Sequence, residues 1–313
     1  MGFDLNVPWP VDNYDSKPSN KQLIVLKGTI STLYVLGYNY IGINFILQEN
    51  ARIPNNPKEI NPIEIKELKE QFKRDFPELR LYTRLTLTFN EPSQCQGLSK
   101  VRSLFDIVAV RPTSEKALQL VAGGLDVDLI SLNMSSRLPF YLKHKTVGSA
   151  VDKGIKFEIC YSQMVSGPAG YSTLNDSNGL SSTASMARKS FLNNVIQLIR
   201  ASRSRGLVVS SGATQPLQVR NAHDILNFLQ TVGLDRSKSK SCISTNPERA
   251  LVSGRLRVTS YNQTVVAEDG TNKRDMLYNN ERENPSHKSD ANVYKKRLVD
   301  TSSGQLLKKQ RNK

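Results

Sequence analysis

The sequence has few histidines and cysteines, and this scarcity limits the chemistry that the chain can perform. Three of each occur among 313 residues. Cys95, Cys160 and Cys242 form no C-x-x-C pair, which excludes a disulfide framework and a zinc ribbon, and their odd number suits a reducing compartment. No apolar run reaches the roughly 18 residues that cross a bilayer, so we expect no contact with a membrane.

Motifs for nucleotides and for nucleophilic catalysis are missing as well. The chain has no G-x-G-x-x-G sequence and no Walker A loop. Ser210 and Ser211 follow an apolar stretch, but they lack the G-x-S-x-G pattern of a catalytic serine. His144, His223 and His287 lie too far apart to form a metal-ligand pattern with the cysteines.

Positive charge is what the sequence has in excess. It contains 43 Lys and Arg against 28 Asp and Glu, a formal net charge of +15. Residues 1–258 hold 32 basic and 21 acidic residues, net +11, and residues 259–313 hold 11 and 7, net +4. Because the excess belongs mainly to the first segment, we expect that segment to bind a polyanionic partner.

The chain divides near residue 258. Residues 1–258 have regular apolar patterning, whereas residues 259–313 are almost continuously polar and charged. A segment with so few apolar residues cannot bury a core. We therefore predict one folded domain over 1–258 and a disordered basic tail over 259–313.

Short β-rich segments alternate with helix-length segments in the predicted domain. The expected strands are 3–5, 40–47, 79–89, 106–110, 127–132, 155–160 and 207–210. Apolar residues three and four apart in the spacers indicate helices. Gly37, Gly154 and Gly206 stand where a helix would end before the next strand. This alternation predicts parallel strands joined by right-handed crossovers.

The number of units favours a closed barrel. Seven units, with a short eighth strand expected at 242–244 before a helix at 246–257, predict an α/β fold of the TIM-barrel type, a β/α barrel of seven or eight parallel strands. A doubly wound open sheet is the alternative. Periodicity does not separate the two folds, although the dinucleotide fingerprint usual in the open sheet is missing.

The carboxyl ends of the strands, where barrel enzymes hold their reactive groups, carry little chemistry here. Those positions are Asn6, Gln48, Asn90, Arg111, Asn133, Tyr161 and Ser211. They include no histidine, and Arg111 is the one charged residue among them. We therefore predict no catalytic, metal-binding or cofactor-binding residue in this chain.

Basic residues gather instead in short groups of the kind that bind phosphate. The predicted RNA-binding residues are Arg203, Arg205, Arg200, Arg137, Lys143, Lys145, Arg111, Arg84, Arg255 and Arg257. For Arg200 and Arg203 the alternative is a stabilising interaction with the dipole of the helix that they end. Arg203 and Arg205 lie where a helix leads into a strand, so we place them at the amino-terminal end of the barrel.

Several motifs, in the same order along the chain, resemble the eukaryotic ribonuclease P/MRP protein subunit family of about thirty kilodaltons, in its fungal form. They are 4–9 (DLNVPW), 36–45 (LGYNYIGINF), 105–112 (FDIVAVRP), 114–116 (SEK), 136–139 (SRLP), 143–145 (KHK), 201–206 (ASRSRG) and 207–213 (LVVSSGA). The resemblance covers residues 1–258 and does not extend to the tail.

The resemblance implies a barrel similar to the PHP phosphoesterases, in which the first strand ends in a D-x-H-x-H metal motif. The matching positions here are Asp4, Asn6 and Pro8, so both histidines are missing. The family implies a non-catalytic subunit that binds and stabilises a catalytic RNA, for 5′-leader removal from precursor tRNA and for pre-rRNA processing. The alternative is a metal-dependent phosphoesterase of the PHP barrel type.

The same resemblance implies the surroundings of the chain. Its partners would be the catalytic RNA of ribonuclease P and MRP, a small RRM-like protein subunit, other particle proteins and precursor tRNA as the substrate. Mg²⁺ is expected at the RNA active site, with no cofactor bound by this chain. The family implies a location in the nucleus and the nucleolus, and two short basic groups at 295–297 and 308–313 have the composition of a nuclear import signal.

Overall fold

The computed structural model describes residues 2–14, 16–49, 54, 60–95, 97–166 and 180–259. Residues 260–313 lie outside this part, so the prediction for the tail stays a prediction. In the described part no helix is long and apolar enough to cross a membrane.

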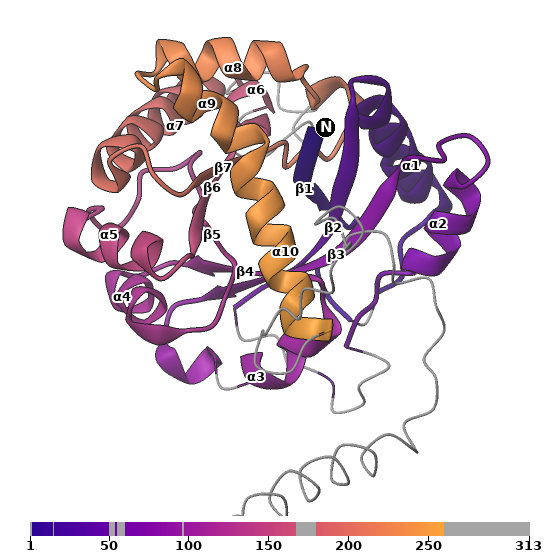
Figure 1. The fold of residues 1–313 in the computed structure, drawn as a ribbon, viewed down its shortest axis with the longest axis horizontal. Coiled ribbons are helices and arrows are strands. Elements are labelled where there is room, and N and C mark those ends of the chain that lie inside the picture. Colours follow the sequence, from indigo (N-terminus) through magenta and orange to yellow (C-terminus); the bar gives the residue numbers. More distant parts are fainter. Residues whose placement is uncertain are drawn as a thin grey trace, which may run out of the picture. The chain divides into compact units, whose positions relative to one another are not determined.

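Seven parallel strands form one sheet that curls into a nearly closed barrel (Figure 1). They are β1 (Gly2–Pro8), β2 (Tyr38–Leu47), β3 (Arg80–Phe89), β4 (Ile107–Pro112), β5 (Leu129–Ser131), β6 (Lys156–Cys160) and β7 (Leu207–Ser210). Neighbours in the sheet follow the order of the sequence from β1 to β7. Because a doubly wound sheet reverses its strand order at a switch point, this order excludes the open-sheet alternative and confirms the predicted barrel.

Helices and short helical turns connect the strands and cover the outside of the barrel (Figure 1). They are α1 (Asn20–Val35), α2 (Ile65–Phe72), η1 (Pro92–Cys95), α3 (Leu98–Val101), η2 (Arg102–Leu104), α4 (Glu115–Gly124), α5 (His144–Asp152), α6 (Ser162–Ser166), α7 (Leu180–Ser202), η4 (Pro216–Gln218), α8 (Ala222–Thr231), α9 (Arg236–Ile243) and α10 (Thr245–Thr259).

The predicted eighth strand is wrong. Residues 242 and 243 are the last two residues of α9, which begins after its extended N-cap residue, Asp235. Ser244 then connects α9 directly to α10. Over only three residues, the pattern of apolar and polar side chains does not distinguish a strand from one turn of a helix. The predicted helix that follows it is confirmed as α10.

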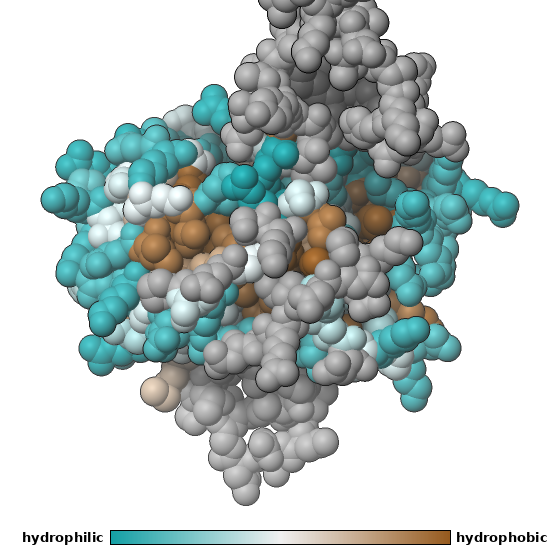
Figure 2. All heavy atoms as spheres, turned by 90° about the horizontal axis from the view of Figure 1, so that it is seen from below, coloured by the Kyte–Doolittle hydropathy of each residue, from teal (hydrophilic) through white to brown (hydrophobic). Residues whose placement is uncertain are grey.

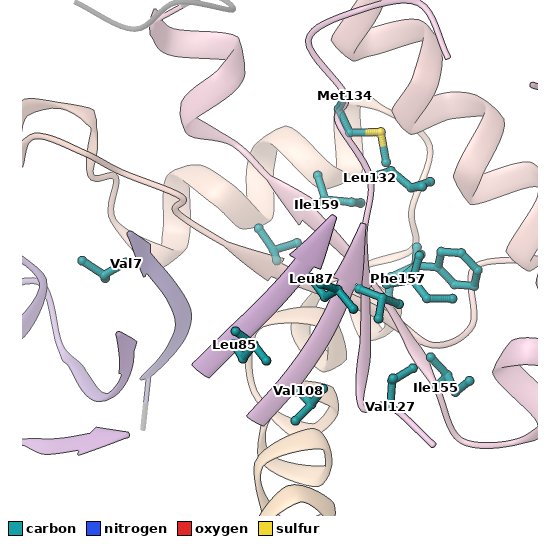
Figure 3. Close-up of a cluster of buried hydrophobic side chains, with 14 of the residues drawn as sticks. Val7, Leu85, Leu87, Val108, Val127, Leu132, Met134, Ile155, Phe157 and Ile159 are labelled. Atoms are coloured by element: carbon teal, nitrogen blue, oxygen red, sulfur yellow. The ribbon is translucent and has the colours of Figure 1, made fainter. Parts of the chain in front are cut away.

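The hydrophobic core lies between the strands and the outer helices. Alternate strand residues point outward, so Val108 of β4 and Phe157 and Ile159 of β6 are buried against helices. Figure 3 shows this layer, in which side chains of several strands gather on the outer face of the barrel. The other alternate residues point into the barrel, where Phe3 stacks on Tyr40 with ring centroids 4.6 Å apart.

Strand β1 closes the barrel by an irregular path. Its register with β2 shifts between Asp4 and Val7, and the β1 backbone there approaches β2 so closely that a Cβ at Gly42 would lie 2.8 Å from the Leu5 carbonyl oxygen. Only glycine fits that position. On the other side, the Gly212 amide after β7 donates to the Asn6 carbonyl, 2.9 Å away.

Helix α10 runs across the ring of strands (Figure 1) and closes its amino-terminal end. Arg255 Nη1 lies 2.6 Å from Asp106 Oδ1, just before β4, and Arg257 Nη1 lies 2.7 Å from Asp128 Oδ1, just before β5. Asn246 Nδ2 donates to the carbonyl of Leu207 at the start of β7, 2.7 Å away. The helix thus binds three strands at their first residues.

The surface is not uniformly charged. Figure 2 shows one face on which hydrophilic side chains follow the edge and apolar side chains appear between them nearer the middle. The large apolar residues most exposed in the described part are Val35, Leu217 and Tyr141, at 78 %, 76 % and 72 %. Val35 shares α1 with the exposed Ile24 and Val25, and Leu217 lies on η4, which packs against α1.

We predict that Gly254→Ala destabilises the protein. A Cβ at Gly254 of α10 would lie 2.1 Å from the Asp106 carbonyl oxygen, so α10 would have to move. Such overpacking costs about 1–3 kcal/mol of unfolding free energy, measured by urea denaturation. The control is Gly123→Ala in α4, where a Cβ meets nothing within 4 Å and helix propensity favours alanine. A stability gain in both variants would contradict the docking of α10.

Candidate nucleic-acid interface

Two of the basic motifs, far apart in the sequence, meet at the outer surface of the barrel. His144 Nδ1 lies 2.7 Å from the Ala201 carbonyl oxygen, so the start of α5 packs against the end of α7. At the other end of α5, Arg205 Nη1 lies 3.4 Å from Asp152 Oδ1. We call the set of exposed cations formed here the α5–α7 basic cluster: Lys143, Lys145, Arg200, Arg203 and Arg205.

The backbone that presents Arg203 and Arg205 is strained. After α7 ends, Arg203, Ser204 and Gly206 have φ angles of +54°, +58° and +64°. A left-handed conformation costs about 1–2 kcal/mol for a residue with a side chain. Two such residues in a row, held by a hydrogen bond of 3.0 Å from the Ser204 amide to the Ile199 carbonyl, point to a functional constraint on this turn.

The cluster keeps an excess of positive charge. Lys143 pairs with Glu115 at 2.5 Å and Arg205 pairs with Asp152, but all four side chains are well exposed, and such pairs contribute about 0–1 kcal/mol. Arg200, Arg203 and Lys145 have no acidic group within ion-pair distance among the described residues. The cluster can therefore bind an external anion without first losing a strong internal partner.

Arg137 extends the basic surface along α7. It is exposed and follows Ser136, whose carbonyl accepts a hydrogen bond of 2.8 Å from Asn194 Nδ2 in the middle of α7. The same amide group donates to the Met134 carbonyl at 2.9 Å. This segment after β5 is thus fastened to the helix that ends in the basic cluster.

Three arginines of the predicted RNA-binding set have a structural position instead. Arg84 is fully buried inside the barrel, and the side chain of Arg257 is 4 % exposed in its pair with Asp128. Arg255 is mostly buried in its pair with Asp106. A phosphate cannot reach Arg84, and at Arg255 and Arg257 it would have to displace a buried carboxylate, so we remove these three residues from the set.

Arg84 and Glu158 form an ion pair in the centre of the barrel. Arg84 Nη1 and Nη2 lie 2.5 and 2.7 Å from Glu158 Oε1 and Oε2, and both side chains are 0 % exposed. Arg84 also donates to the Leu5 carbonyl at 2.9 Å and to Thr86 Oγ1 at 3.2 Å. Burial alone would raise the pKa of Glu158, but the adjacent guanidinium outweighs it and holds that pKa below its usual range.

Asparagines complete this interior network. Asn6 Nδ2 lies 3.1 Å from Glu158 Oε2, and Asn6 Oδ1 accepts from Asn44 Nδ2 at 2.7 Å. Asn44 Oδ1 in turn accepts from Thr86 Oγ1 at 2.8 Å. The interior therefore holds a hydrogen-bonded chain across strands β1, β2, β3 and β6.

These residues do not fit a metal ion. Both ends of the Asn6 amide are used in the network, Glu158 is neutralised by Arg84, and Pro8 has no ligand atom. Across the described ranges, no group of three or more His, Cys, Asp and Glu side chains could hold a metal. The first strand thus serves the packing of the barrel at the positions where the PHP pattern has its histidines.

Asp4 bridges the seam between β1 and β7. Its Oδ1 accepts from the Ser211 amide at 3.0 Å and from the Asn6 amide at 3.1 Å, while its buried Oδ2 has no hydrogen-bond partner in the described part. Burial raises the pKa of Asp4 to about 6, although the hydrogen bonds from Ser211 and Asn6 oppose the shift. Glu158 adds a smaller upward contribution.

Sequence reasoning missed Glu158, whereas it gave Asp4 a structural role as an acceptor of backbone hydrogen bonds, which the structure confirms. Glu158 stands in the middle of an apolar strand, KFEIC, at a position of the inward-facing alternation. An acidic residue there indicates a buried partner, because an unpaired charge in a strand core is too costly. The pattern does not name that partner, which lies 74 residues away in the sequence.

We predict that Glu158→Gln costs about 3–5 kcal/mol of unfolding free energy, because it leaves the Arg84 guanidinium buried without a counter-charge. The surface control is Asp126→Asn, in a pair with Arg102 whose side chains are 38 % and 47 % exposed, where the loss should stay below about 1 kcal/mol. The double variant Arg84→Met with Glu158→Leu should recover much of the loss. Equal losses in E158Q and D126N would refute this role.

We predict that Asp4→Asn changes the pH dependence of stability. The folded pKa of about 6 exceeds the ordinary 3.8, so the folded state binds the extra proton and wild-type stability falls as the pH rises through this range. Relative to wild type, the variant should gain about 3 kcal/mol between about pH 4 and about pH 7. Urea denaturation at several pH values measures the difference. A difference that does not vary with pH would mean that Asp4 titrates normally.

Comparison with known proteins identifies the family. A family model described as RNase P subunit p30 matches residues 1–259. The chain is 40 % identical to ribonuclease P/MRP protein subunit RPP1 of Saccharomyces cerevisiae over 279 residues, 89 % of each chain. It is 33 % identical to the probable ribonuclease P protein subunit 3 of Schizosaccharomyces pombe, over 83 % of this chain and 97 % of that protein. It is 29 % identical to ribonuclease P protein subunit p30 of Mus musculus, over 78 % and 85 %.

The fold has a relative among solved structures. A chain in the cryo-EM structure of archaeal ribonuclease P with mature tRNA matches with a TM-score of 0.55 and 18 % identity, over 79 % of this chain and 96 % of that chain. At this identity the likeness concerns the fold, and it agrees with the barrel described above. The resemblance found in the dispersed motifs is confirmed, and so is the prediction of a protein subunit in place of an independent enzyme. The chain belongs to the RNase P subunit p30 family.

Proposed function

We propose that this chain acts in a ribonuclease P/MRP particle by binding phosphates of the particle's RNA with the α5–α7 basic cluster. The observation that carries the proposal is the contact between His144 and Ala201, which joins two basic motifs into one exposed surface. Three cations of that surface have no acidic partner in the described part. Family membership supports RNA as the polyanion.

The geometry suits the RNA backbone better than individual bases. Exposed Lys and Arg side chains on helix ends contact phosphates and fix the position of a protein on RNA, whereas sequence is read by groups that reach base edges. The strained turn at Arg203 and Ser204 fixes the direction of two of these cations. The cluster would therefore hold a folded RNA by its shape.

The chemistry would come from the RNA and not from this chain. The interior polar residues are used in packing, and the relatives are named as protein subunits. We infer that Mg²⁺ binds at the RNA active site, and that 5′-leader removal from precursor tRNA and pre-rRNA processing are reactions of the particle. The fold relative found with mature tRNA supports the tRNA reaction.

We further propose a small RRM-like protein subunit as a neighbour in the particle and the nucleus, including the nucleolus, as its location. Membership in a family of eukaryotic ribonuclease P/MRP subunits supports both proposals. A metal-dependent phosphoesterase is the weaker alternative, because Asn6, Glu158 and Pro8 do not fit a metal ion.

We predict that Arg203→Ala with Arg205→Ala weakens RNA binding and lowers its salt dependence. Each lost phosphate contact should reduce the slope of log affinity against log salt by about 1. The charge-matched control is Lys66→Ala in α2 with Lys73→Ala at the C-cap of that helix, which lies on the other side of the ring from α5 (Figure 1). Fluorescence anisotropy with the copurified RNA measures both values at several salt concentrations. Equal slopes in both double variants would favour the helix-dipole explanation for the arginines.

The same variants test the particle in cells. A tagged wild-type chain recovered from a nuclear fraction should bring down the catalytic RNA of ribonuclease P or MRP and the small protein subunit, and the R203A/R205A chain should bring down less RNA. Sequencing of the RNA separates a ribonuclease P/MRP subunit from a general RNA scaffold. Recovery of unrelated RNAs in wild-type samples would contradict the proposal.

A further inference from the structure

We propose that the carboxyl end of the barrel carries a binding site for a phosphoryl group, formed by Arg111 of β4 and Thr88 of β3. This site is separate from the α5–α7 basic cluster and does not depend on the function proposed above.

The register of the sheet places the two residues side by side. Thr88 and Arg111 are partners in the β3–β4 pairing, as Thr86 is with Ala109 and Arg84 with Ile107. Residues paired in this way share a face of the sheet, and Arg84 shows that this face is the interior. Thr88 lies four residues beyond Arg84, about 13 Å further along the strand toward the carboxyl end. Helix α10 covers the opposite end.

Arg111 lacks a counter-charge of its own. Its Nε donates to the Ser131 carbonyl at 3.4 Å, and no carboxylate of the described part lies within ion-pair distance. The Glu158 carboxylate below it is already bound by Arg84. Burial lowers the pKa of Arg111, which shows that the folded protein solvates this cation poorly. The side chain is nevertheless partly exposed, so a small solute can reach it.

Thr88 supplies a second and independent sign. The residue is 7 % exposed, and its buried Oγ1 has no hydrogen-bond partner in the described part. Buried hydroxyls are paired in most proteins, and an unpaired one costs about 1–3 kcal/mol. A donor without an acceptor beside a cation without an anion indicates one missing group that would satisfy both.

A phosphoryl group has the chemistry that the two residues require. With Nε bound to Ser131, the guanidinium still presents the N–H groups of Nη1 and Nη2, which match two oxygens of one tetrahedral anion. The Thr88 hydroxyl can donate to a third oxygen. Two sources share this chemistry: free phosphate or a phosphomonoester, and the phosphodiester of a nucleic-acid backbone.

The test is binding of small phosphates to the full chain, freed of RNA, at constant ionic strength. Inorganic phosphate and dimethyl phosphate are titrated by calorimetry and by ³¹P NMR. Saturable binding of inorganic phosphate is expected, and Arg111→Gln should raise its Kd by roughly tenfold, about 1.4 kcal/mol. Thr88→Val, which keeps the shape and removes the hydroxyl, should raise the Kd severalfold. Tighter binding of inorganic phosphate than of dimethyl phosphate would identify a monoester, and equal binding would identify a diester.

The matched control is Arg74→Gln, an exposed arginine in the turn after α2 that lies outside the predicted RNA-binding set and should leave phosphate binding unchanged. Unaltered circular dichroism and urea denaturation show that each variant is folded. Absence of saturable binding in wild type, or equal binding in wild type and R111Q, would overturn the proposal. Because this assay contains no RNA, its failure leaves the R203A/R205A experiment as a separate test of the RNA interface.

Discussion

The Arg84–Glu158 ion pair is the constraint on which the interior of this barrel depends. Two charges at 0 % exposure are tolerated only when each neutralises the other and the remaining hydrogen-bonding groups are satisfied. The Leu5 carbonyl, Asn6 and Thr86 meet that demand. The polar residues of the first strand are therefore fixed by packing, which explains how a barrel of this type can keep polar interior residues without an active site.

The same constraint shapes the two ends of the barrel. The register of β1 with β2 shifts at the segment that contains Asn6, whose amide contacts the ion pair, and the seam with β7 is bridged by the Asp4 carboxylate and the Asn6 carbonyl. At the amino-terminal end, α10 adds the buried pair Arg257–Asp128 and the partly buried pair Arg255–Asp106, which fasten the helix to β5 and β4. The exposed charges on the outer helices are therefore not required to hold the barrel together.

Periodicity and glycine positions were sufficient to predict the seven strands, since each strand has its own alternation and Gly37, Gly154 and Gly206 end helices with positive φ angles. The role of each arginine could not be predicted in the same way. Arg84 and Arg203 have the same side chain, but Arg84 pairs with Glu158, whereas no carboxylate of the described residues lies within ion-pair distance of Arg203. Whether a cation has a structural role depends on acidic partners that are distant in the sequence, and the local sequence pattern does not predict those partners.

The distribution of ion-pair partners among the arginines also supports the RNA interface that we propose. The arginines that hold the barrel together pair with carboxylates that are buried, as for Arg84 and Arg257, or partly buried, as for Arg255, so much of their charge is cancelled inside the molecule. The cations at the start of α5 and the end of α7 face solvent, with weak pairs or none. Charge that is not cancelled inside the molecule remains available to attract a polyanion, which supports the α5–α7 basic cluster as the RNA interface that we propose. Arginine therefore stabilises the fold at buried positions, and different arginines, at exposed positions, are available to bind a polyanion.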